Sequence, residues 1–428
     1  MCFESEINLI TNGKYKIYSI SDAIKIVTEN CDGKKRNFPP PTPALSNLYQ
    51  GKDNKNSYVE SRYKFPFGIW FRGHERKCYH LKPSLFRDKN DNLKKCSNHE
   101  NKTRETDNPI PSCYYDETSI FYHFQNRMPN YKVNNYSIFD WLCLMQHYEV
   151  PTRVLDWTEN ILVALFFVVK NKQYDDCDGI VYALNSARLN EVSSIISRKR
   201  QMQHPNSLDV ILRSALAVSR TRTQLIKYLK RIDIYEELLS EVKYEEIKKW
   251  LHDNSEDDVI DLMNDEKSKK IIERIGYPIA VYPNRIIERM ALQLSVTTLY
   301  GGKSYDWHKT EKFHIGIQED HERLPDFKSI YSLNKLVSEK NSFLDYDNNP
   351  FDKEFLNAFI VPSNCKVKIR EELKRIGFHD VSMFPEIEYQ AHYIKKQWRN
   401  DFAIPEYDDN CYQTADIVTN PLGVIYDQ

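Results

Sequence analysis

Apolar residues recur along the chain with two spacings, and each spacing predicts one kind of element. Bulky residues alternate over 67–73 and stop at Gly73, which predicts a strand with Arg72 near its end. Apolar residues at helical spacing over 138–145 and again over 161–166 predict two helices. The run 146–158 between them is polar and aromatic. We therefore expect this run to be a short connection between two helices.

The same patterns predict further elements on both sides of this region. Between Leu189 and Gly276 the chain has no glycine and Pro205 as its one proline, while charges recur on a helical period, which predicts a helical insertion. A helix over 366–377 would have Gly377 at its C-terminal cap. A short N-terminal helix is expected over 21–27, and strands are expected over 179–184, 279–282, 294–300 and 358–361.

These elements predict an α+β fold, in which a sheet core is interrupted by helices. The N-terminal lead-in would end near residue 60, and residues beyond 390 would form a tail. The boundaries that we expect are 1–60 for the lead-in, 61–185 for the first part of the core, 186–275 for the insertion, 276–390 for the second part of the core and 391–428 for the tail.

Composition narrows the class of protein. The chain has 428 residues, is 41% hydrophobic and carries a formal charge of -1, so no whole-protein field favours nucleic acid or a membrane. Its nine cysteines are scattered and odd in number, as in a reduced compartment. The start of the chain does not resemble a secretory signal, and the apolar run 161–169 is too short to span a bilayer. We expect a cytoplasmic protein without a membrane segment.

The run 146–158 holds the densest group of candidate functional side chains. They are Gln146, His147, Thr152, Arg153, Asp156, Trp157 and Thr158. Such a connection between helices is typical of a binding segment. The alternative is a rigid turn in which Asp156 or Thr158 caps the next helix, Arg153 pairs with Asp156 and Trp157 packs in the core. Both interpretations remain open from these residues alone.

A resemblance to a known family rests on short motifs in a fixed order. Phe71-Arg72-Gly73, Pro83-Ser84-Leu85, Gln146-His147, Pro151-Thr152-Arg153 and Leu155-Asp156-Trp157-Thr158 resemble the FRG domain family. The match is densest over 65–170 and weakens towards 390. Glu149 stands where the family pattern usually has glycine, so we expect the turn before Pro151 to be built differently.

The order of an Arg strand, a Thr segment and a late polar strand also resembles ADP-ribosyltransferases. That resemblance implies a mixed sheet and NAD as cofactor, with Arg72 on phosphate, Thr152 and Arg153 on ribose or phosphate, and Trp157 or Phe71 on nicotinamide. Gln293 would orient the ligand or acceptor, but it cannot ionise, so Glu388, beside Glu386 on an expected strand, is an alternative acid.

The resulting candidates fall into two groups. The catalytic candidates are Arg72, Thr152, Gln293 and Glu388, and the ligand-binding candidates are Phe71, Gly73, Gln146, His147, Arg153, Asp156, Trp157 and Thr158. No metal site is expected, because the histidines at 74, 80, 123 and 147 lack zinc-ligand spacing.

Three functions follow as hypotheses. The resemblances imply binding of NAD or a related nucleotide, with ADP-ribosyl transfer to a protein or nucleic-acid acceptor, or NAD cleavage, in a bacterial toxin or phage-defence setting. A sensor or interaction module without chemistry is the first alternative. The second is nucleic-acid binding through the basic insertion, which includes Arg213, Arg220, Arg222, Lys227 and Lys230.

Overall fold

The computed structural model describes ten stretches of the chain, and all structural statements refer to them. These are residues 16–30, 69–87, 115–129, 135–196, 205–233, 235–252, 256–302, 324, 333 and 356–397. Two compact units are present, Met1–Pro385 and Glu386–Gln428. None of the helices in the described ranges is long and apolar enough to cross a membrane. The Pro-rich segment near residue 40 and the polar stretch 88–114 lie outside the described residues.

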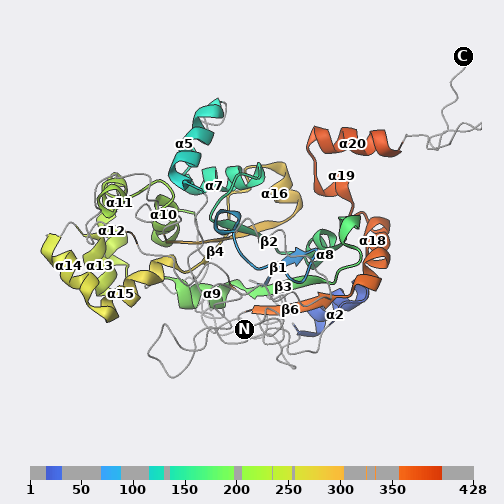
Figure 1. The fold of residues 1–428 in the computed structure, drawn as a ribbon, viewed down its shortest axis with the longest axis horizontal. Coiled ribbons are helices and arrows are strands. Elements are labelled where there is room, and N and C mark those ends of the chain that lie inside the picture. The colour runs from blue at the N-terminus through green and yellow to red at the C-terminus, as the bar shows by residue number, and fades with distance from the viewer. Residues whose placement is uncertain are drawn as a thin grey trace, which may run out of the picture. The chain divides into compact units, whose positions relative to one another are not determined.

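A six-stranded sheet forms the centre of the first unit, in the order β4-β5-β2-β1-β3-β6 (Figure 1). Its strands are β1 (Ile69–His74), β2 (Val154–Thr158), β3 (Gly179–Asn185), β4 (Ile279–Val281), β5 (Ser295–Leu299) and β6 (Leu356–Val361). Three strands therefore come from each side of the predicted helical insertion. All five pairings are antiparallel, so the expected α+β class is confirmed and the expected mixed sheet is wrong.

Helices cover one face of the central strands. Ile69 and Phe71 of β1 point to this face and pack with α8 (Ile161–Val169), an almost wholly apolar helix. Two further helices, α2 (Ile20–Asn30) and α18 (Lys366–Arg375), pack against α8. Gly377 follows α18 with a φ of 89°, as expected for a glycine that ends a helix. Two short elements flank α18, namely η7 (Ser363–Cys365) and α19 (Asp380–Met383).

The opposite face is packed by aromatic and branched side chains. Trp70 of β1 and Tyr182 of β3 point to this face, where Leu81 and Phe86 cover them. These covering residues belong to the segment after β1, which includes the short helix η1 (Ser84–Phe86). Because successive side chains of a strand alternate, Arg72 and His74 share this face with Trp70.

A group of helices lies between β3 and β4 in the chain and builds a core of its own around Trp250 and Leu212. Its elements are α9 (Ser186–Ser193), α10 (Leu208–Ala215), α11 (Arg222–Leu229), α12 (Tyr235–Ser240), α13 (Glu245–Leu251), α14 (Glu256–Asn264), α15 (Glu266–Ile272) and η4 (Glu273–Gly276). Helix α10 also contacts α7 (Ile138–His147), which packs with α5 (Glu117–Arg127). The helices are present as expected, while the domain boundaries stay a prediction.

Three sequence expectations about local structure are wrong. Residues 154–158 form the buried strand β2 and not a loop between helices, because they pair with both β1 and β5. Gln293 caps the C-terminus of α16 (Glu288–Leu292) and does not lie on a strand. In the second unit, Glu388 lies in the first turn of α20 (Ile387–Gln397), so Glu386 and Glu388 do not share a strand face.

Candidate functional site

Arg72 joins two elements at the C-terminal end of β1. Its Nη1 donates a hydrogen bond to the carbonyl oxygen of Asp156 on β2, and its Nε donates to Nε2 of His74 at 2.9 Å. Nδ1 of His74 lies 3.2 Å from the carbonyl oxygen of Tyr79. Since Nε2 accepts from Arg72, the ring proton is on Nδ1 and is donated to Tyr79. Both ring nitrogens are thus occupied, and His74 positions Arg72.

Burial controls the charge state of this pair. It lowers the pKa of Arg72 to about 10, with Asp156 opposing the shift and Arg87 adding to it, so the guanidinium stays charged at neutral pH. Burial, followed by the charges of Arg72 and Arg87, holds the pKa of His74 well below its usual value of 6.5. His74 is therefore neutral at pH 7, as its hydrogen bonds require.

A cavity of about 340 Å³ opens beside Arg72. Four cationic side chains line it, Arg72 from β1, Lys82 and Arg87 from the following segment, and Lys170 from the C-terminal cap of α8. Among the described residues that line it, Glu75 is the one carboxylate, and Tyr79 and Phe167 are also present. The excess of cationic over acidic side chains among these residues favours an anionic ligand, because partial burial strengthens each attraction.

A chain of hydrogen bonds supports Arg72 from behind. Thr152 Oγ1 donates to Gln146 Oε1 at 2.6 Å, and Gln146 Nε2 donates to Asp156 Oδ2 at 2.8 Å. Asp156 then presents its carbonyl oxygen to Arg72. Thr152 is fully buried and does not line the cavity, and its catalytic role stays a prediction. The motif from Gln146 to Asp156 holds the strand that positions the guanidinium.

Arg153 has a structural role instead of the expected ligand contact. Its side chain is fully buried and paired with Glu117 of α5, with 2.8 Å between Nε and Oε1. Its Nη1 donates to the carbonyl oxygens of Tyr300 and Gly302 at 3.2 and 3.0 Å. The expected pairing with Asp156 is therefore wrong. These hydrogen bonds use the donors of Arg153 and connect α5 to the residues that follow β5.

Two expected stacking residues and one capping residue are part of the core. Phe71 packs beneath α8, and Trp157 is buried and donates from Nε1 to Thr298 Oγ1 at 3.1 Å. Thr158 Oγ1 donates to the carbonyl oxygen of Gln293 at 2.6 Å. Asn160, rather than Asp156 or Thr158, provides the N-terminal cap of α8. None of these side chains lines the cavity beside Arg72.

Gly73 lines this cavity, whereas Gln293, His147 and Glu388 are not among its lining residues. Gln293 donates from Nε2 to the carbonyl oxygen of Met383 at 3.0 Å, and His147 ends α7, where its carbonyl oxygen accepts from Arg289 at 2.8 Å. Neither lines the cavity. Glu388 belongs to the second unit and is exposed. The expected trio of Arg72, Thr152 and Gln293 is therefore not assembled around one ligand space.

Two backbone features explain the motif residues around the site. A Cβ atom at Gly73 would lie 1.9 Å from the carbonyl oxygen of Ala164, so the glycine allows β1 to pack directly on α8. Glu149 has a φ of 60°, the conformation that glycine favours. Its amide and that of Val150 donate to Gln146 and Met145 and close the end of α7. The turn thus has a glycine-type conformation at Glu149, and the expectation that it is built differently from that of relatives stays a prediction.

Sequence reasoning missed most of the residues that surround the cavity, namely His74, Glu75, Lys82, Arg87 and Lys170. For three of these residues the sequence contained a pattern that could have indicated their place at the site. Strand alternation places His74 on the same face as Arg72, and Lys82 and Arg87 flank the motif Pro83-Ser84-Leu85. Lys170 had no such signal, because only the packing of α8 on β1 brings it to the cavity.

Comparison with known proteins identifies the region that holds this site. Residues 68–177 match the family model of the FRG domain. The match includes β1, α5, α7, β2 and α8, and it contains Arg72 and the whole run 146–158. Neither a curated protein nor a solved structure matches the chain. The resemblance to ADP-ribosyltransferases therefore stays a prediction.

Proposed function

We propose that this chain, which contains an FRG domain, binds a phosphate-bearing nucleotide in the cavity beside Arg72, with NAD as the first candidate. The observation that carries the proposal is the lining of that cavity, where Arg72, Lys82, Arg87 and Lys170 face a single carboxylate, Glu75. Phosphate oxygens are the natural partners of such a cluster, because each can accept several charge-assisted hydrogen bonds.

Arg72 is the best-prepared phosphate ligand of the four. Hydrogen bonds to His74 and Asp156 fix its guanidinium before any ligand arrives, so little side-chain entropy is lost on binding. A charged guanidinium fork also matches the geometry of phosphate oxygens. Phe167 and Tyr79 add aromatic surface for a base or a nicotinamide ring. The site therefore suits a nucleotide better than inorganic phosphate.

We favour recognition without chemistry, as in a sensor. His74 cannot act as a general base while both ring nitrogens hold hydrogen bonds, and Thr152 is buried. NAD cleavage is the second candidate, and Glu75 is the observation that favours it. Burial raises the pKa of Glu75, and Lys170 and Lys366 oppose the shift. A carboxylate in the cavity could stabilise a developing oxocarbenium ion, whereas the sequence offered Glu388 as the acid.

The biological setting is part of the same proposal. Either NAD recognition or NAD loss would suit a bacterial toxin or a phage-defence protein, and the resemblance noted from the sequence is the support for that setting. A protein or nucleic-acid acceptor would be required only for ADP-ribosyl transfer.

Thermal unfolding with and without ligand tests the proposal. NAD⁺, ADP and inorganic pyrophosphate are added to the wild type, Arg72→Gln, Lys170→Gln and the control Lys172→Gln, which changes an exposed lysine outside the cavity. A ligand at about 100 times its Kd adds about 2.7 kcal/mol to the free energy of unfolding. We expect NAD⁺ and ADP to raise the Tm of the wild type and Lys172→Gln, and to raise it less in the other two variants.

Nicotinamide release, measured on the same samples with Glu75→Gln added, separates the two candidates. A ligand-dependent rise in Tm without release supports the sensor. Release that is lost in Glu75→Gln while the rise in Tm remains supports cleavage. No rise in Tm with any of the three compounds would overturn the proposed binding function.

A further inference from the structure

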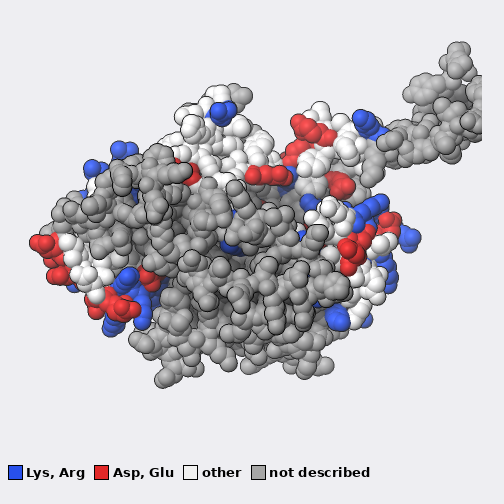
Figure 2. Space-filling model, viewed as in Figure 1, with Lys and Arg blue, Asp and Glu red and all other residues white. Residues whose placement is uncertain are grey.

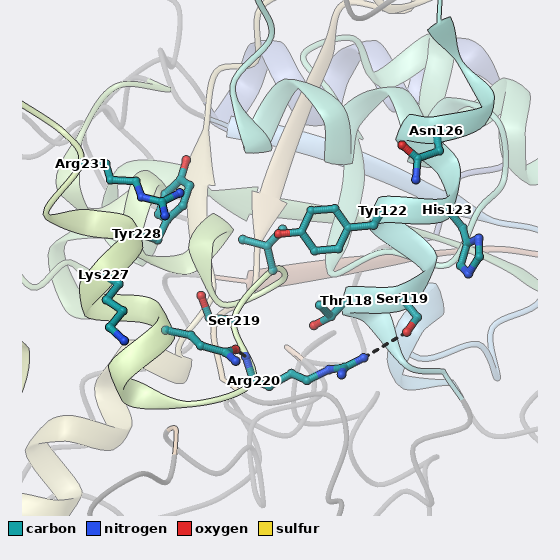
Figure 3. A pocket seen from close by; sticks show the side chains of 12 residues that line it. Thr118, Ser119, Tyr122, His123, Asn126, Ser219, Arg220, Lys227, Tyr228 and Arg231 are labelled. Atoms are coloured by element: carbon teal, nitrogen blue, oxygen red, sulfur yellow. Dashed lines mark hydrogen bonds between the residues drawn. The ribbon is translucent and has the colours of Figure 1, made fainter.

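A second cleft, of about 500 Å³, lies between α5 of the FRG domain and α11 of the helical group, together with residues 218–220 before α11 (Figure 3). Thr118, Tyr122 and Asn126 line it from α5, while Lys227 and Tyr228 line it from α11. None of the residues that line the cavity beside Arg72 belongs to this cleft. It is therefore a separate site on the same unit.

The charges of this cleft have one sign. Arg220, Lys227 and Arg231 line it, and the described lining residues include no Asp or Glu. Arg220 pairs with Asp116 at 3.0 Å, but both side chains are partly exposed, so a phosphate could replace that carboxylate at little cost. On the face in Figure 2, by comparison, Lys, Arg, Asp and Glu side chains of the described residues are interspersed.

Aromatic side chains accompany the cations. Tyr122 projects from α5 into the space, and Tyr228 lies across from it beside Lys227 and Arg231 (Figure 3). Tyr122 is 50% exposed, so much of its side chain is accessible to a ligand. Burial and the nearby Tyr122 both raise the pKa of Tyr228, which keeps its hydroxyl neutral. Tyrosine rings beside cations are suited to bases that carry phosphates.

Two arginines of the basic segment considered in the sequence analysis are buried, so they do not contribute to a basic surface. Arg213 is buried and bound to Asp209 and to the carbonyl oxygen of Tyr277. Arg222 is buried as well, and it donates to the carbonyl oxygens of Trp250 and His252. Both stabilise the helical core. Of the described cations in this segment, Arg220, Lys227 and Arg231 line the cleft and Lys230 is exposed outside it. No ion pair with a described residue holds Lys227 or Arg231.

We infer that this cleft binds single-stranded nucleic acid, with backbone phosphates on Lys227, Arg231 and Arg220 and an unpaired base on Tyr122. A strand fits better than a mononucleotide, because Lys227 on α11 and Arg231, just beyond the C-terminal cap of that helix, are separate cations that can contact more than one phosphate. A duplex fits less well, because its bases are stacked and do not reach a tyrosine ring.

Fluorescence anisotropy with the full chain tests this inference. The probe is a labelled 12-nucleotide strand of mixed sequence, titrated at several salt concentrations, and the variants are Lys227→Gln, Tyr122→Leu and the control Lys230→Gln. Lys230 lies on the same helix end, is exposed and does not line the cleft. Three phosphate contacts predict a slope of log K against log salt near -2, and Lys227→Gln should reduce its magnitude by about 0.7.

Tyr122→Leu should weaken binding roughly tenfold with the slope unchanged, since stacking on a base does not depend on salt. Lys230→Gln and Lys170→Gln should bind like the wild type, which separates this cleft from the cavity beside Arg72. Equal loss in Lys227→Gln and Lys230→Gln would overturn the inference. The inference would also be overturned if ADP displaced the strand completely at concentrations near its Kd for the cavity beside Arg72. Tighter binding of a duplex than of the strand, or no binding at low salt, would overturn it as well.

Discussion

Nε of Arg72 donates a hydrogen bond of 2.9 Å to Nε2 of His74, two residues further along the same strand. This bond fixes both the direction of the guanidinium and the tautomer of the imidazole, whose other nitrogen donates to Tyr79. In this chain the segment Phe71-Arg72-Gly73 is thus followed by a residue that positions its arginine. The pair holds Arg72 at the basic cavity, where we propose that it binds an anion.

His74 should make the stability of the protein depend on pH. Its folded-state pKa lies well below 6.5, so as the pH falls the unfolded chain binds a proton before the folded one does. The free energy of unfolding should fall below about pH 6.5 by up to ~1.4 kcal/mol per pH unit from this residue. In His74→Gln, whose amide oxygen can still accept from Arg72, this part of the slope should be absent. Urea unfolding at pH 7.5 and 5.5 measures the difference, and identical slopes would contradict the assignment.

The buried pair of Arg153 and Glu117 should act as one structural unit. Removing one partner leaves a buried charge, so Arg153→Met and Glu117→Leu should each cost about 3–5 kcal/mol in urea unfolding. The double variant should cost less than the sum of the two by more than about 1 kcal/mol. Additive losses would show that the two side chains do not depend on each other. Folded Arg153→Met should keep its affinity for ADP.

Gly73 should be required for the contact between β1 and α8. A Cβ atom there meets the carbonyl oxygen of Ala164 at 1.9 Å and Val168 at 2.9 Å, so Gly73→Ala must move the strand or the helix and should cost about 1–3 kcal/mol. The control is Gly377→Ala, where a Cβ meets nothing within 4 Å and only the φ of 89° opposes it. Gly73→Ala should lower the affinity for ADP, whereas Gly377→Ala should not. A Gly73→Ala variant with unchanged stability would contradict this packing.

Glu149 should be a position where glycine is preferred. Its φ of 60° strains any residue with a Cβ, by about 1–2 kcal/mol in the left-handed region, while glycine costs roughly 0.5–1 kcal/mol in the unfolded chain. Glu149→Gly should therefore raise the free energy of unfolding by up to about 1 kcal/mol. Glu149→Ala, which removes the side chain but keeps the strain, should be less stable than Glu149→Gly. The reverse order would mean that the turn relaxes without strain.

The spacing of apolar residues predicted those strands and helices that bury one face of the strand or one stripe of the helix in the core. The alternation before Gly73 gave β1, and the apolar stripes gave α7 and α8 within a few residues of their ends. The mixed sheet was implied by the resemblance to ADP-ribosyltransferases and not by this periodicity, and the pairings between the described strands are antiparallel.

The motif 146–158 was misinterpreted because its polar side chains find their partners far along the chain. Arg153 meets Glu117 from α5, and Trp157 meets Thr298 from β5. Such pairings let polar residues lie in a central strand, although their sequence resembles a loop. The cavity depends equally on long-range packing, which brings Lys170 to Arg72. Only Arg72 among the expected catalytic residues lines it.

The most direct test of the anion-binding cavity is a calorimetric titration of ADP into the wild type, Lys170→Gln and Lys172→Gln. Lys170 is exposed at the rim of the cavity, so its replacement should leave the fold intact, and Lys172 is the matched exposed lysine outside it. The account predicts a Kd that rises about tenfold in Lys170→Gln, as expected for a lost hydrogen bond to a charged group, and stays unchanged in Lys172→Gln. The same Kd in all three proteins, or no heat of binding in the wild type, would contradict it.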